Sequence, residues 1–441
     1  MLKSLNLHGV GPVRDLSASF GDRLNIITGD NGLGKSFLLD VCFWSLTGTW
    51  PGGRTAMPVP NGKKQAPTIT YEIKGKAQQK KEPKTASFEF ASQTWTRPKG
   101  RPFKPGLVIY ASVDGGFAVW DPARNYWRDP TSGLKEGEEQ PRAYQFTPET
   151  LANGLKDGER VLCNGLVQDW VNWYYEQDTG KSSSSTGEPE PIIHPFHYFE
   201  EVVSALSHPS EPMSCGEPKR VYVDQPRKYP VLAMPYGDVA YPQWPAGVRR
   251  IISLAYLVVW TWYEHVQAAE LRNEDLTNRL ILVVDEIESH FHPRWQRTIL
   301  PALLRIVQKL HAQIEMQVIA ATHSPLVLAS LEPHFNEAVD QLFCFNLVAT
   351  KTPKKRVTFD ALPWAVHGDV VAWLTSDVFG LEQARSLEAE QAIESAEAFI
   401  RGDTEQLQPG FSTRDEINYQ LRKTLASLDP FWPRWMVEAR K

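Results

Sequence analysis

Short apolar runs that end in glycine or polar residues recur along the chain and predict buried strands. In the first part of the chain, three such runs precede an expected apolar helix that ends near residue 46, and they lie at residues 2–7, 13–20 and 24–27. Further strand-like segments, expected to form hairpins beside this first lobe, lie at residues 68–73, 87–90, 107–110 and 117–120. The opening of the chain therefore predicts an α/β lobe with flanking β-hairpins.

After residue 236, helical and strand periods alternate, which indicates a mostly parallel sheet. The pattern predicts helices at residues 246–271 and 294–310, and strands at residues 279–284, 317–321 and 341–346. Before this part, a helical patch is expected at residues 161–175, and a Ser- and Pro-rich stretch at residues 182–191 predicts a flexible link.

These patterns divide the chain into four predicted regions. An N-terminal lobe with a β subdomain, a partly helical insertion, a C-terminal lobe and a helical C-terminal region are expected at residues 1–120, 121–235, 236–350 and 351–441. The last region contains an Ala- and Glu-rich segment at residues 382–401 and ends in an aromatic cluster, Phe431, Trp432 and Trp435. Aromatic side chains near a terminus usually pack, so a docked tail is expected there.

Residues 29–36 read Gly-Asp-Asn-Gly-Leu-Gly-Lys-Ser and follow an apolar strand, which matches the phosphate-binding pattern G-x-x-x-x-G-K-[ST]. Backbone N–H groups of such a loop and of the helix after it wrap phosphate oxygens. Lys35 is expected to reach the β- and γ-phosphates of ATP, and Ser36 is expected to bind Mg²⁺. The other candidate residues of this loop are Gly29, Asn31, Gly32 and Gly34.

Two later apolar strands also end in polar side chains that suit this chemistry. Residues 280–284 lead into Asp285 and Glu286, and residues 318–321 lead into Thr-His-Ser-Pro, which contains His323. Acids at the carboxyl end of a central strand lie where α/β sheets bind their ligands. We expect Asp285 to hold Mg²⁺, directly or through a water, and Glu286 to orient or deprotonate the attacking water. His323 is expected to donate a hydrogen bond to the γ-phosphate.

Together with the stretch Asp-Glu-Ile-Glu-Ser-His-Phe-His-Pro at residues 285–293, these elements resemble ABC-type ATPases of the SMC, RecF and OLD group. They look most like the compact ATPases of prokaryotic defence systems such as the Septu, retron-associated and PARIS types. The resemblance covers residues 1–50 and 230–350. It implies an α/β ABC-type ATPase head with a mostly parallel sheet and an antiparallel β subdomain. It also implies a homodimer, or a larger homo-oligomer, with ATP at the interface.

Members of this family carry a Ser-x-Gly signature turn that opens a helix and reaches the γ-phosphate of the partner subunit. The matching stretch here begins at Pro245, and Gly247 fits the family glycine. Pro245 replaces the usual serine and removes a hydroxyl and an N–H donor, so closure of a composite site is expected to be weak or slow. The same stretch also fits an ordinary helix cap. The glutamine that couples nucleotide to the flanking subdomain is not assigned, and Gln145 and Gln168 are candidates.

Composition and charge exclude several classes of protein. The formal net charge of −5 argues against a surface that binds nucleic acid throughout, although local basic patches stay open. The four cysteines are far apart and form no C-x-x-C pair, so neither a zinc module nor a disulfide framework is indicated. The longest apolar run is too short to cross a bilayer, so a cytoplasmic protein without a membrane partner is expected.

A nuclease of the Toprim kind, which OLD-like relatives carry, needs a Glu near a Gly and then an Asp-x-Asp to hold metal. After residue 324 the acids Asp360, Asp369 and Asp377 are scattered, and no long heptad region indicates SMC-type arms. Chemistry on nucleic acid is therefore expected to belong to a separate effector protein.

The leading hypothesis is a Mg²⁺-dependent ATPase that acts as a nucleotide-driven switch and controls a nuclease or toxin in anti-phage defence. The alternative is a RecF-like ATPase that binds DNA in repair or maintenance. A transporter subunit is disfavoured because the signature turn lacks Ser-Gly-Gly-Gln. A small-molecule kinase is disfavoured because the acid pair and His323 suit attack by water better than attack by a hydroxyl group.

Overall fold

The computed structural model describes residues 1–59, 66–74, 83–96, 104–125, 142–177, 194–310, 313–350, 355–403, 407 and 409–438. It divides into two compact units, Met1–Val366 and His367–Lys441. Within the described residues, no helix is both long enough and apolar enough to span a membrane.

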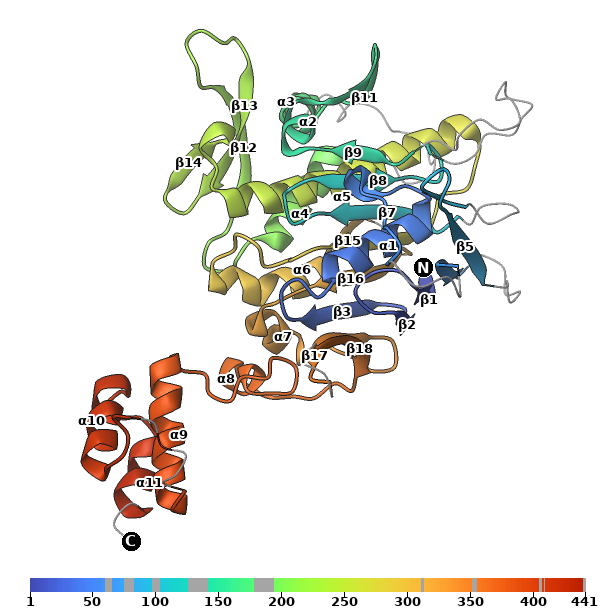
Figure 1. Ribbon diagram of the computed structural model, residues 1–441. Helices are drawn as coiled ribbons and strands as arrows, with labels where there is room; N and C mark the ends of the chain where they lie inside the picture. Colours follow the sequence, from blue (N-terminus) through green and yellow to red (C-terminus); the bar gives the residue numbers. More distant parts are fainter. Residues whose placement is uncertain are drawn as a thin grey trace. The chain divides into compact units, whose positions relative to one another are not determined.

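The first unit is built on an eight-stranded sheet with the strand order β18-β17-β3-β16-β15-β7-β8-β9 (Figure 1). All neighbouring pairs from β17 to β7 are parallel, whereas β18, β8 and β9 join antiparallel at the two edges. Its strands are β3 (Leu24–Gly29), β7 (Leu107–Ala111), β8 (Phe117–Trp120), β9 (Tyr144–Phe146), β15 (Arg279–Val284), β16 (Glu315–Ala321), β17 (Gln341–Val348) and β18 (Arg356–Leu362). Because β16 lies between β3 and β15, the carboxyl ends of these three strands are neighbours.

A second sheet is antiparallel throughout and has the order β2-β1-β4-β5-β6. Its strands are β1 (Leu2–His8), β2 (Asp15–Ser19), β4 (Thr68–Ile73), β5 (Lys84–Glu89) and β6 (Thr94–Trp95). Helix α1 (Lys35–Thr47) shares one hydrophobic core with both sheets. A helix covered on all sides needs apolar residues around its whole circumference, which is the pattern that α1 has.

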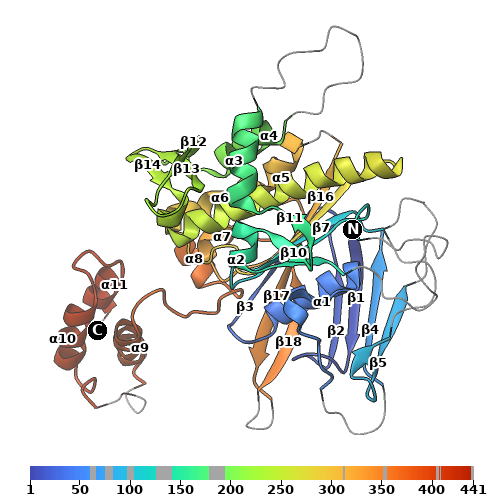
Figure 2. The same cartoon turned by 90° about the horizontal axis from the view of Figure 1, so that it is seen from above.

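The opposite face of the main sheet carries α5 (Ala246–Arg272) and α6 (Pro293–Leu310) (Figure 2). Helix α4 (Pro195–Leu206) packs against both of them, and α7 (Pro325–Leu331) packs against α6. The structure confirms the predicted fold class, an α/β domain with a mostly parallel sheet, an antiparallel β subdomain and C-terminal helices.

The predicted helical patch at residues 161–175 is wrong at its start. This part contains α2 (Pro148–Asn153), the hairpin of β10 (Leu155–Asp157) and β11 (Arg160–Cys163), and then α3 (Leu166–Glu176). Gly165 has a φ of 88°, and a Cβ there would lie 2.4 Å from the backbone nitrogen of Gly154. The positive φ of Gly165 and its close approach to Gly154 place a turn just before α3. The link predicted at residues 182–191 lies outside the described residues.

Two strand-forming segments had no clear sequence signal. A three-stranded sheet of β12 (Ser214–Arg220), β13 (Lys228–Met234) and β14 (Gly237–Ala240) precedes α5 and the short 3₁₀ turn Tyr241–Gln243. Glycine, proline and charged residues in β12 hide its alternation. Strand β18 begins at Arg356, and no strand was predicted there. Strand β9 lies in the predicted insertion and β18 in the predicted C-terminal region, yet both join the main sheet. The division into four regions stays a prediction.

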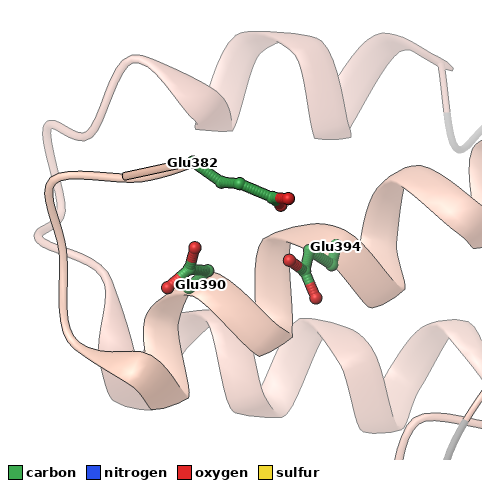
Figure 3. A group of neighbouring side chains, drawn as sticks. All are labelled: Glu382, Glu390 and Glu394. Carbon is green, nitrogen blue, oxygen red and sulfur yellow. The ribbon is translucent and has the colours of Figure 1, made fainter. Parts of the chain in front are cut away.

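The second unit contains α8 (Val370–Leu374), α9 (Leu387–Arg401), α10 (Arg414–Thr424) and α11 (Phe431–Glu438). Phe431 and Trp435 are buried in its own core, as expected of a docked aromatic tail. Within the Ala- and Glu-rich segment, helix α9 begins at Leu387, and the side chain of Ser386 caps it by accepting from the backbone N–H of Ala389. Figure 3 shows three carboxylates that gather beside this helix, those of Glu382, Glu390 and Glu394.

Candidate functional site

The phosphate-binding loop connects β3 to α1 in a conformation that requires glycine at two places. Gly29 has a φ of 124°, and a Cβ there would lie 2.2 Å from a backbone oxygen of β17. Gly34 has a φ of 111°, and a Cβ there would lie 2.4 Å from the ring of Pro12. Both positions lie in the left-handed region that other residues rarely adopt. Asn31 and Gly32 are exposed, so the loop is open to solvent where a phosphate would bind.

Lys35 lies inside this loop. It is only 5% exposed, and its ammonium donates to the carbonyl oxygens of Gly29 and Asp30, both at 2.8 Å. Burial lowers the pKa of Lys35, and the nearby carboxylates of Glu286 and Asp285 act in the opposite direction. Phosphate oxygens can replace the two carbonyls as acceptors, so this position fits the predicted role of the lysine.

Asp285 comes directly after the last residue of β15 and lies next to the phosphate-binding loop. It is 2% exposed, and it shares a side-chain hydrogen bond with Ser36. Burial raises the pKa of Asp285, and the bond from Ser36 opposes that change. Its Oδ1 atom is buried and has no hydrogen-bond partner among the described residues. A buried carboxylate oxygen without a partner is unfavourable, and Mg²⁺ prefers carboxylate, hydroxyl and water oxygens. Ser36 and Asp285 therefore fit the predicted Mg²⁺ site.

Glu286 and His323 lie side by side at the same edge. His323 Nε2 is 3.6 Å from Glu286 Oε1, and both side chains are partly exposed. The His323 ring also hydrogen-bonds to the backbone of Gly29, and burial lowers the pKa of His323. Glu286 has a φ of 45°, an unusual conformation for a residue other than glycine. The structure thus brings the predicted base and the predicted phosphate sensor together at the phosphate-binding loop.

Glu288 is a site residue that the motif analysis left without a role. Its carboxylate accepts from the Thr322 hydroxyl at 2.8 Å and from the His323 backbone N–H at 2.5 Å. Burial raises the pKa of Glu288, while these hydrogen bonds oppose the change. These hydrogen bonds connect the residues that follow β16 to the segment that follows β15. Its place two residues after Glu286 was the only available signal.

Arg250 is a second residue that sequence reasoning missed. It lies in the second turn of α5, and its guanidinium donates to the carbonyl oxygens of Asp285 at 2.8 Å, Val113 at 3.0 Å and Glu286 at 3.3 Å. Every residue has a backbone carbonyl, so the residue types at the contacted positions give no sign of these hydrogen bonds. Arg250 therefore could not be found from the sequence.

The start of α5 is the stretch that matches the family signature turn. Pro245 and Ala246 are exposed there, whereas Gly247 packs against the segment that follows β15. A Cβ on Gly247 would lie 2.7 Å from the carbonyl oxygen of His290. The helix start is thus open to solvent, and contact with the nucleotide of a partner subunit stays a prediction.

The two candidate glutamines differ in their surroundings. Gln145 in β9 donates to the carbonyl oxygen of Trp50 at 3.1 Å and accepts from the backbone N–H of Gly52 at 3.0 Å. It ties the segment after α1 to the edge of the main sheet. Gln168 lies on the exposed side of α3 and donates to Asn172 at 2.8 Å. Gln145 is the better placed of the two to link α1 to its surroundings.

Two family models match this chain. One, described as an AAA domain, matches residues 4–104, and the other, described as "AAA domain, putative AbiEii toxin, Type IV TA system", matches residues 267–329. The first contains the phosphate-binding loop, and the second contains Asp285, Glu286 and His323. Both halves of the site thus lie in segments that match AAA-domain models.

Curated relatives include two retron proteins. The Retron Vc95 probable ATPase of Vibrio cholerae serotype O1 biovar El Tor is 37% identical over 97 residues, which are 20% of this chain and 18% of the relative. The Retron Ec83 probable ATPase of Escherichia coli is 29% identical over 103 residues, which are 23% of this chain and 15% of the relative. This chain therefore matches less than a fifth of the length of either relative. Over these short stretches the chain is similar to retron probable ATPases.

Solved structures with a similar chain path include an SMC head domain from Thermotoga maritima, at 15% identity and a TM-score of 0.36 over 81% of this chain and 98% of that one. RecF with bound ATP is 11% identical, with a TM-score of 0.35 over 82% of this chain and 97% of that one. These scores are too low to bear on function.

Proposed function

We propose that this chain, which carries an ATPase domain of the AAA type related to retron ATPases, binds ATP and Mg²⁺ between two copies and hydrolyses the nucleotide. The observation that carries the proposal is the convergence of Lys35, Asp285 and Glu286 at one edge of the main sheet, with a buried Asp285 oxygen left without a partner. Three neighbouring strands, β3, β16 and β15, supply this edge.

Each residue has a defined task in this proposal. The ammonium of Lys35 leaves the two loop carbonyls and neutralises the β- and γ-phosphates. Ser36 and Asp285 hold Mg²⁺, which supplies further positive charge for the developing charge on phosphate. Glu286 orients the attacking water and accepts its proton. The ring of His323 donates to the γ-phosphate.

The nucleotide cycle is proposed to control a separate effector, a nuclease or toxin, in anti-phage defence. Both relatives are named as retron ATPases, which supports a defence role. Among the described residues, the group of three or more possible metal-ligating side chains consists of Glu382, Glu390 and Glu394 in the second unit, and the sequence around them does not have the Toprim pattern. A catalytic partner is therefore the simplest source of chemistry on nucleic acid.

A RecF-like DNA-binding ATPase is the second candidate, because basic side chains gather on the β12–β13 hairpin. Most of them already have partners: Lys219 pairs with Asp238 at 2.6 Å, and Lys228 donates to the Tyr175 hydroxyl at 2.6 Å. The ion pair with Asp238 offsets the charge of Lys219, whereas the Tyr175 hydroxyl is neutral and leaves the charge of Lys228 available to DNA phosphates. DNA binding that weakens steeply with salt would favour the second.

Phosphate release by the purified chain with ATP and Mg²⁺ tests the proposal. The parent is expected to release phosphate, and a Glu286→Gln variant is expected to bind ATP without releasing it. Removal of Mg²⁺ with a chelator should stop release in the parent. A parent that binds ATP but releases no phosphate would reduce the site to one that only holds the nucleotide.

A further inference from the structure

The start of α5 and the segment after β15 are joined by two contacts on the same face of the helix. Gly247 and Arg250 are three residues apart, so they lie on one side of α5. Gly247 leaves room for the carbonyl of His290, and Arg250 donates to the carbonyls of Asp285 and Glu286. Helix α5 thus contacts this segment near the segment's start, at Asp285 and Glu286, and near its end, at His290.

The segment that α5 holds is unusual in its backbone. Glu286 and His290 both have positive φ values, 45° and 67°. Residues other than glycine adopt this region at a cost of about 1–3 kcal/mol, and only where the surroundings impose it. The carbonyls of these two residues are the ones that Arg250 and Gly247 contact. The backbone that aims the Glu286 side chain therefore depends on α5.

The charges around Arg250 strengthen this connection. Burial lowers the pKa of Arg250, and the carboxylates of Asp285, Glu286, Glu288 and Asp114 act in the opposite direction. A guanidinium stays protonated in such a setting and offers a rigid, planar set of donors. It can hold three carbonyls from two strand ends at once, which a lysine could not do.

We propose that Arg250 is a positioning residue that couples the location of the α5 start to the orientation of Glu286. The inference rests on the proposed function, in which the exposed start of α5 engages the nucleotide of a second copy. When that engagement moves the helix, Arg250 carries the movement to the peptide bonds of Asp285 and Glu286. Hydrolysis then requires that the partner copy has bound the start of α5.

The test compares Arg250→Met and Arg250→Lys with a matched control, Arg272→Met, in the full chain. Arg272 lies at the other end of α5 and also donates to a backbone carbonyl, that of Ala123 at 2.7 Å. Hydrogen–deuterium exchange and single-turnover hydrolysis at saturating ATP are measured for all of them. Saturation separates nucleotide affinity from the chemical step.

In Arg250→Met, residues 285–291 should exchange faster than in the parent, and ATP should slow exchange at the start of α5 without slowing it at residues 285–291. Hydrolysis should fall about 100-fold with ATP affinity unchanged, since a small displacement of a catalytic group has effects of this size. Arg250→Lys should recover part of the rate, and Arg272→Met should match the parent. Unchanged exchange at residues 285–291, or an equal loss of rate in Arg272→Met, would overturn the inference.

The exchange measurement also keeps this inference apart from the proposed function. If the parent hydrolyses no ATP, the proposed function fails. The difference in exchange between the parent and Arg250→Met then still decides whether Arg250 links α5 to the Glu286 segment.

Discussion

At the scale of single residues, the nucleotide site places several ionisable groups where water is scarce. Asp40 lies on α1 one helical turn after Ser36 and accepts a hydrogen bond from the Tyr110 hydroxyl at 2.6 Å. Burial raises the pKa of Asp40 to about 6, and the charge of Asp285 adds to the rise. A second carboxylate beside the predicted Mg²⁺ ligand is thus protonated more easily than usual.

Asp40→Asn should therefore change stability in a way that depends on pH. Because the pKa of Asp40 is higher in the folded chain than in the unfolded chain, the stability that its proton provides is lost as the pH rises through about 6. The variant should be more stable than the parent by about 2 kcal/mol at pH 8, and the difference should shrink towards pH 5. Urea unfolding at both pH values measures it.

The control for this prediction is Asp157→Asn on the exposed β10–β11 hairpin, where no difference between the two pH values is expected. A stability difference for Asp40→Asn that is the same at pH 5 and pH 8 would contradict the account of its environment.

Glu288→Ala should affect both stability and catalysis. The substitution leaves the Thr322 hydroxyl and the His323 backbone N–H without their acceptor, and such a loss costs about 1–3 kcal/mol. Hydrolysis should slow while ATP affinity is kept, because the position of His323 is loosened but the phosphate-binding loop is intact. Chemical denaturation and nucleotide titration check these two outcomes. Glu315→Ala, at the exposed start of β16, is the matched control, and an equal effect there would rule out a specific role of Glu288.

At the scale of elements, strong periodicity made the sequence informative. β4, β8 and β15 were predicted to the residue, and α5 ends one residue later than expected. Strand β12 was missed because Gly216 and Pro218 interrupt its alternation. β1 and β2 were found as strands, but β1 also pairs with β4, and β4 pairs with β5, both distant in sequence, so the strand order of this sheet could not be assigned in advance.

The candidate site was predictable where side chains form motifs. Lys35, Ser36 and Asp285 follow from the phosphate-binding pattern and the acidic strand end. Arg250 and the exact surroundings of Gln145 were not predictable, because both act on backbone groups of distant segments. Such contacts depend on how the elements pack, and a single sequence records only the side chains.

Gly247→Ala tests the contact between α5 and the segment after β15. The added Cβ would lie 2.7 Å from the His290 carbonyl oxygen, so the helix start must shift outward. ATP binding by the single copy should persist, since the phosphate-binding loop is not touched, and ATP-dependent self-association should weaken. Sedimentation with and without ATP measures this. Ala246→Ser, at the exposed neighbouring position, should behave like the parent, and weakening there as well would argue for a general effect of the region.

At the scale of the whole molecule, the account requires two copies for each complete site. The first unit supplies both the phosphate-binding loop and the exposed start of α5, and in the proposed dimer each loop faces the α5 start of the other copy. A symmetric dimer repeats such a contact twice. A site that needs two copies can be restored by mixing two different inactive variants, whereas a site within one copy cannot.

A mixture of two inactive variants should regain activity. Lys35→Ala removes the lysine of the loop, and Gly247→Ala displaces the α5 start, so neither variant alone should hydrolyse ATP well. In a mixed dimer, one site combines the intact loop with the intact α5 start. Random pairing should restore at most about a quarter of the parent rate, because Gly247→Ala also shifts the α5 that contacts the Glu286 segment in the copy that supplies the loop. Steady-state phosphate release of the mixture measures this. A rate equal to the mean of the two separate variants would show that the copies act independently.

The most direct test of the central claim is the mass of the Glu286→Gln chain in solution with and without ATP and Mg²⁺. The account predicts a monomer without nucleotide and a dimer with ATP, because the variant binds ATP and cannot release it by hydrolysis. ADP should leave the monomer unchanged. A mass that is the same in all three conditions would contradict a site shared between two copies.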